Sequence, residues 1–115
     1  MNQEDFRNYC LGLGDVTEKM PFGKFARRYD SILAFYVSGH MFCFVDIEDF
    51  AWMDIRLTAD EVTALREQYV SAGDPVNQSP RYWIKVNFDG DVPERVVWKL
   101  VKRAYEVVSG KYKKS

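Results

Sequence analysis

The spacing of hydrophobic positions along the chain predicts three helices. Residues 3–13 carry an apolar stripe at the i, i+3, i+4, i+7 spacing of one helical face, and Asn2 is the expected cap. Residues 58–69 begin with Thr58-Ala-Asp-Glu61, the pattern of a capping box. The longest stripe follows Asp91, which is expected to cap the last helix, and Gly110 is expected to end it.

Apolar runs with a period of two predict the strands. Residues 31–37 and 40–47 are expected to form a hairpin across Ser38-Gly39, and both faces of its strands are apolar. Residues 52–57 alternate cleanly, so this strand should have one buried and one wet face. Residues 81–88 are expected to form a fourth strand, with Ile84, Val86 and Phe88 on one face and Trp83, Lys85 and Asn87 on the other. Pro21 limits the segment 16–23 to an edge strand, and residues 71–80 are expected to form a loop. This order of elements indicates an α+β protein.

Length and composition indicate one globular domain. The chain has 115 residues, of which 47% are hydrophobic and 16% aromatic, enough for a single packed core. We expect a domain over residues 1–110 and a basic tail over 111–115. The longest apolar run, Ile32–Val37, is far too short to span a membrane, and the N-terminus lacks the pattern of a signal peptide, so a cytoplasmic location is expected. Cys10 and Cys43 form no CxxC pair; two buried thiols are the favoured interpretation and a disulfide is the alternative.

Charge is distributed unevenly along the chain. The net charge is −1, yet Met1–Pro93 holds 9 Lys+Arg against 15 Asp+Glu, whereas Glu94–Ser115 holds 7 against 2. A basic C-terminal end on an acidic body favours contact between that end and a polyanion.

Several short motifs, in order, resemble one protein family. Pro21-Phe22-Gly23 follows a helix with Tyr9-Cys10-Leu11, Gly39-His40-Met41-Phe42 opens a strand, and Leu65–Tyr69 ends the second helix. Trp83 begins a strand that ends near Asp89–Pro93, and the last helix carries Ala104–Val108. Together they resemble the MmcQ/YjbR family over Phe6–Val108.

The resemblance implies a fold and a role. The fold is frataxin-like, also called double wing: an antiparallel sheet of about four to five strands with three helices packed on it. The implied role is DNA binding. The chain departs from the family at His40, where a basic residue is usual, and in the loop Asn77–Trp83, where mainly Arg81 and Trp83 match and Tyr82 replaces an imidazole.

The residues offer little for catalysis or for binding a metal or cofactor. His40 is the single histidine, neither cysteine has a second histidine to pair with, and no phosphate-binding glycine motif occurs. The acidic residues Asp46, Glu48, Asp49 and Asp54 favour a solvated turn over a cation site. We therefore expect no enzyme, no cofactor and no small-molecule substrate.

Two groups of cations and rings are candidate contacts for nucleic acid, because phosphates need positive charge and bases stack on flat rings. One group lies on the strand near residue 83 and the other on the outer face of the last helix. Their members are Arg81, Tyr82, Trp83 and Lys85, then Arg95, Lys99, Lys102 and Arg103. The first group could instead be core, and the second could be an ordinary polar helix face.

The first functional hypothesis is a non-enzymatic DNA-binding (nucleic-acid-binding) module that uses both groups. The alternative hypothesis is a protein-interaction or adaptor domain, including a homodimer through an exposed sheet face or edge. The aromatic content favours this alternative, and an enzyme is the third possibility.

Overall fold

The computed structural model describes residues 1–21, 31–76 and 78–112. Its three helices are α1 (Gln3–Leu11), α2 (Ala59–Gln68) and α3 (Glu94–Lys111). Its strands are β1 (Val16–Lys19), β2 (Ile32–Val37), β3 (His40–Asp46), β4 (Trp52–Arg56), β5 (Ala72–Gly73) and β6 (Trp83–Asn87). Within the described residues, no helix is long and apolar enough to cross a membrane.

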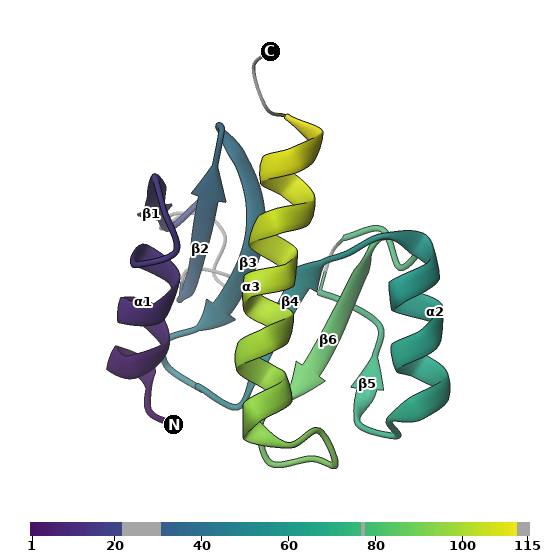
Figure 1. Cartoon of the computed structure of the whole chain (residues 1–115). Helices are drawn as coiled ribbons and strands as arrows, with labels where there is room; N and C mark the ends of the chain where they lie inside the picture. Colours follow the sequence, from purple (N-terminus) through teal and green to yellow (C-terminus); the bar gives the residue numbers. More distant parts are fainter. Residues whose placement is uncertain (22–30, 77, 113–115) are drawn as a thin grey trace.

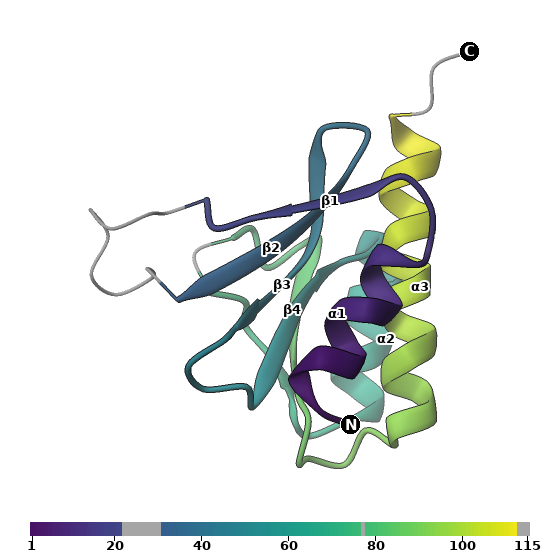
Figure 2. The ribbon, with the colours of Figure 1, turned by 90° about the vertical axis from the view of Figure 1, so that its left-hand side faces the viewer.

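The described strands form one antiparallel sheet in the order β1-β2-β3-β4-β6-β5. Helix α3 packs against β3 and β4 at the middle of the sheet, with α1 and α2 on either side of it (Figure 1). All three helices lie on the same side of the sheet (Figure 2). The predicted α+β class, antiparallel sheet and three helices are confirmed, with six strands in place of four to five.

The main core lies between the sheet and the helices. The apolar stripe of α3 supplies Val97, Val101, Ala104 and Val108, all buried. Phe6 of α1 is fully buried and contacts an aromatic group made of Phe35, Phe50, Phe88 and Trp98, with ring centroids 5.6–6.3 Å apart. Burial of apolar side chains is the dominant favourable term in folding, so the core on the helix side of the sheet stabilises the fold most.

A bulge in the β2–β3 hairpin decides which side chains reach this core. Phe35 pairs with Cys43, but the next residue, Tyr36, pairs with Met41, so Phe42 is the extra residue. Phe42 and Cys43 therefore both belong to the core on the helix side, although they are adjacent in sequence. The predicted two-residue turn is confirmed: Ser38 and Gly39 both have positive φ, at 54° and 79°.

Two predicted caps are confirmed and a third is corrected. The Asn2 side chain accepts from Asp5 N–H, and Thr58 and Glu61 form the full capping box. Asp91, however, does not cap α3, whose N-cap is Pro93 without a side-chain bond. The Asp91 carboxylate instead accepts from the backbone N–H groups of Val70 and Ser71, and so joins the end of α2 to the turn before α3.

Element ends differ slightly from the predictions. Helix α1 ends at Leu11 because Gly12 begins the turn, and α3 continues through Gly110 to Lys111. Residues 71–80 were expected to form only a loop, but Ala72 and Gly73 form β5 at the sheet edge. The edge position predicted within 16–23 is confirmed for β1. The rest of that segment from residue 22 onward, and the tail residues 113–115, lie outside the described residues.

Candidate nucleic-acid interface

The sheet side opposite the helices carries two residues of the strand group predicted from the sequence, Trp83 and Lys85. Strand pairing aligns Lys19, Ala34, Phe44, Asp54 and Lys85 in one row across β1, β2, β3, β4 and β6. Because side chains alternate along each strand, the residues two positions away share this side. We call this surface the helix-free face; its members are Thr17, Lys19, Ile32, Ala34, Tyr36, Met41, Phe44, Asp46, Trp52, Asp54, Arg56, Trp83, Lys85 and Asn87.

The centre of the helix-free face is a second, smaller core. Ile32, Ala34, Phe44 and Trp83 are buried together, and Val76 from the segment before β6 packs against them. The rings of Phe44 and Trp83 lie 5.6 Å apart, and Trp83 is only 6% exposed. Trp83 therefore packs in this small core beneath the surface. The sequence had left open whether Trp83 was an exposed contact or part of a core.

Cations lie over aromatic rings around this small core. Lys19 Nζ lies 4.5 Å from the ring centroid of Tyr36, and Lys85 Nζ lies 4.7 Å from that of Trp52. Both rings are half-buried, so each presents part of its surface to solvent. Each pair is a cation–π contact, which holds a positive charge and a flat apolar surface side by side.

A further group of this kind lies next to the start of β6. The side chains of Arg56 and Arg81 lie 5.7 and 5.4 Å from the ring centroid of Tyr82, which is 38% exposed. Of the predicted strand group, Lys85 thus lies on the helix-free face, and Arg81 and Tyr82 lie beside it in the turn before β6, where Tyr82 contacts Arg56. Lys19, Tyr36, Trp52 and Arg56 were not among the predicted contacts. The alternation in residues 52–57 could have identified Trp52 and Arg56, because it places them together on one face.

Asp54 occupies the middle of the helix-free face and is fully buried. Its Oδ2 accepts a 2.6 Å hydrogen bond from Val76 N–H, while its Oδ1 has no partner among the described residues. Burial raises the pKa of this carboxyl from 3.8 to about 7, against the lowering effects of the Val76 hydrogen bond and of Lys85. Asp54 is thus separate from the turn acids with which the sequence grouped it.

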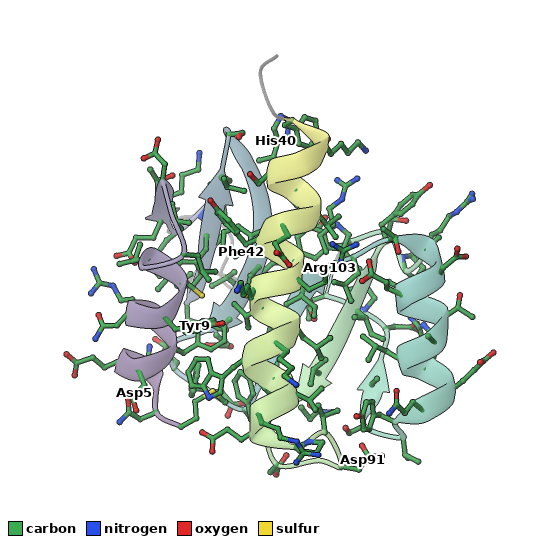
Figure 3. All side chains as sticks on the ribbon, in the orientation of Figure 1. Asp5, Tyr9, His40, Phe42, Asp91 and Arg103 are labelled. Atoms are coloured by element: carbon green, nitrogen blue, oxygen red, sulfur yellow. The ribbon has the colours of Figure 1, made fainter. Side chains whose placement is uncertain are left out.

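The predicted helix group lies on the other side of the sheet. Arg95, Lys99 and Lys102 are exposed on α3, whereas Arg103 bonds Glu61 of α2 at 2.7 Å and lies between the two helices (Figure 3). Burial acts to raise the pKa of Glu61, but its hydrogen bonds from Arg103 and Thr58 outweigh burial and lower it. Because α3 packs on the side opposite Lys85, the two predicted groups do not form one continuous basic surface.

The acidic turn after β3 is held by its own hydrogen bonds. Asp46 Oδ1 accepts from Ser31 Oγ at 2.8 Å and from the backbone N–H groups of Glu48 and Asp49 at 2.9 and 3.2 Å. In the described part of the chain, no three His, Cys, Asp or Glu side chains gather in a way that could hold a metal ion.

The histidine and the two cysteines, which were considered for catalysis on the sequence alone, are packed against other parts of the fold. His40 stacks on Tyr112 with ring centroids 3.4 Å apart, which fixes the hairpin tip to the end of α3 (Figure 3). Cys10 and Cys43 are both buried free thiols. Burial raises the pKa of Cys43 well above its ordinary value, and a contact with Cys10 adds to this. A thiol in such surroundings is a poor nucleophile.

One groove of about 450 Å³ lies on the helix side, beside the start of α1. Its lining contains none of the predicted contact residues and consists of Asn2, Gln3, Glu4, Phe6, Arg7, Leu33, Phe35 and Val45.

Comparison with known proteins places the chain. The crystal structure of a Deinococcus radiodurans protein with a DUF419 domain matches with a TM-score of 0.84 at 24% identity, covering 97% of this chain and 81% of that one. A Pseudomonas syringae protein matches at 16% identity in both a crystal structure (TM-score 0.72, covering 94% and 99% of the two chains) and a solution NMR structure (TM-score 0.68, covering 94% and 93%). No curated protein matches the sequence. The YjbR family model matches residues 11–107, and the chain therefore belongs to the YjbR family.

Proposed function

We propose that this chain binds nucleic acid, DNA in the first instance, through the helix-free face and without catalysing a reaction. The observation that carries the proposal is the set of four cations on and beside this face, Lys19, Arg56, Arg81 and Lys85, each lying over an aromatic ring. Positive groups bind phosphates, and rings beside them stack on bases.

The ion pairs of the cations favour the helix-free face over the outer face of α3 as the binding site. On α3, Arg103 is already bonded to Glu61, and Glu94 and Glu106 lie along the same helix. The four cations on and beside the helix-free face have no salt bridge with a described carboxylate within 4.0 Å. A phosphate that binds at this face would therefore not have to displace a described carboxylate from these cations.

The form of the ligand follows from the geometry of the rings. Trp52 lies on a sheet face and Tyr82 in the turn before β6, and neither belongs to a helix that could enter the major groove. Stacking on them requires unpaired bases, so we expect single-stranded DNA to bind more tightly than a duplex of the same sequence.

A pair of matched double variants tests the site. Lys85→Gln with Arg56→Gln removes two positive charges from the helix-free face, and Lys99→Gln with Lys102→Gln removes two from α3. Fluorescence anisotropy with a labelled single strand, measured over a series of salt concentrations, gives the affinity and its salt dependence. We expect the first pair to weaken binding about tenfold or more at low salt and to flatten the salt slope by about one to two.

The α3 pair should leave the affinity close to that of the wild type. If the α3 pair weakens binding and the Lys85/Arg56 pair does not, the site assignment is wrong. If the wild-type chain shows no affinity at low ionic strength, the nucleic-acid role itself is wrong. A stable dimer in light scattering would then favour the protein-interaction alternative.

A further inference from the structure

We propose that Asp54 makes nucleic-acid binding at the helix-free face pH-dependent, because ionisation of its buried carboxyl places a negative charge at the centre of the cationic surface. This inference rests on the proposed function and adds a regulatory group to the same site. Asp54 is the cross-strand neighbour of Lys85 on one side and of Phe44 on the other. Arg56 and Trp52 flank it along β4 on the same face.

The surroundings of Asp54 stabilise its neutral form. One carboxyl oxygen has a single hydrogen bond, from Val76 N–H, and the other has no partner among the described residues. Lys85, the nearest cation in the row, lies over the Trp52 ring and forms no ion pair with the carboxylate. A buried charge with so few partners is costly, which agrees with the pKa of about 7.

The other acids near Asp54 have hydrogen-bond or ion-pair partners of their own. Asp46 is engaged by Ser31 and its own turn, and Asp74 is engaged by Arg66 of α2 at 2.8 Å. On the helix side, Cys43 is affected by the charge of Asp54 but is kept neutral by burial. The titratable and charged groups that the described strands place on the same face as Asp54 are Lys19 (β1), Tyr36 (β2), Asp46 (β3), Arg56 (β4) and Lys85 (β6). The segment before β6 adds Asp74, Arg81 and Tyr82.

The expected size follows from Coulomb's law. A buried charge about 10 Å from a bound phosphate, at an effective dielectric constant of about 20–30, changes affinity by about five- to fifteenfold. The coupling is reciprocal, so a bound phosphate must also favour the protonated form of Asp54. Binding near neutral pH should therefore take up a proton.

Anisotropy with a labelled oligodeoxythymidine of about 20 nucleotides, compared at pH 6 and pH 8, tests the inference. Because its pKa is about 7, Asp54 is not fully neutral at pH 6 and not fully ionised at pH 8, so the wild type should bind about three- to sixfold more tightly at pH 6. Asp54→Asn should bind equally at both values. His40→Gln removes the single histidine of the chain and is the matched control; it should keep the wild-type pH dependence.

A second measurement does not depend on the variant. The carboxyl ¹³C signal of Asp54 in the wild type should titrate with a higher midpoint when the chain is saturated with the oligonucleotide. An unchanged midpoint, or pH dependence that survives in Asp54→Asn, overturns the inference while leaving the binding role intact. If the chain binds the oligonucleotide at neither pH 6 nor pH 8, the proposed function is overturned together with the inference.

Discussion

Replacing Asp54 by asparagine should raise the free energy of unfolding relative to that of the wild type progressively as the pH rises from about 4 to about 7. Asparagine keeps an oxygen that accepts from Val76 N–H, but it cannot ionise. In the wild type, the folded chain holds the carboxyl protonated up to a pKa of about 7, whereas the ordinary value is 3.8. Between these two values the unfolded chain binds fewer protons than the folded one, so the wild type loses stability as the pH rises.

The magnitude follows from the two pKa values. A separation of about three pH units, at about 1.4 kcal/mol per unit, gives a loss of about 4 kcal/mol for the wild type by pH 8. The asparagine side chain also leaves amide donors without partners, but that cost is the same at every pH. The pH-dependent part of the difference between the two chains therefore isolates the ionisation of Asp54.

Urea unfolding at several pH values between 4 and 8.5 measures this difference. Asp89→Asn, the same chemical change at an exposed carboxyl, is the control and should run parallel to the wild type. A gap between Asp54→Asn and the wild type that stays constant over this pH range would refute the reasoning, since it would mean that Asp54 ionises alike in both states.

Three further substitutions test the local structure by urea unfolding. Thr58→Ala removes the capping box with Glu61 and should cost about 1 kcal/mol; an unchanged midpoint would mean that the bond contributes nothing. Gly110→Ala should add about 0.5–1 kcal/mol, because a Cβ there meets no atom within 4 Å and the residue lies inside α3; a loss of stability would contradict this. Gly14→Ala should cost about 1–3 kcal/mol, because its Cβ would collide with the Tyr105 hydroxyl; no loss would show that the ring moves aside.

Most of the fold could be predicted from the sequence because its signals are local. The Thr58–Glu61 capping box, the Ser38–Gly39 turn and the α3 stripe each depend on residues close together in the chain. Asp91 shows where local signals fail. Its position fits a helix cap, but the N–H groups of Val70 and Ser71 are better placed to use its carboxylate.

The candidate site was less predictable because it depends on strand order. From the sequence, Lys85 and the cations of α3 were expected, as two groups, to serve one binding module, but the pairing of β4 with β6 and the packing of α3 put the two groups on opposite sides of the sheet. Likewise, Asp54 looked like one of several turn acids, and only its position between Phe44 and Lys85 shows that it is enclosed. Neither relation can be derived from hydrophobic periodicity.

The two outer strands have a consequence for behaviour at high concentration. A sheet that ends in free backbone groups can recruit strands from other molecules and grow into aggregates. At one end, β5 has only two residues and so offers a very short template. At the other end, β1 carries Lys19 and Glu18, and Glu18 is bound to Arg7 at 2.7 Å, so an incoming strand would have to accommodate charge. Both described edges therefore offer poor templates for an incoming strand, which favours a chain that can be concentrated without forming intermolecular sheets.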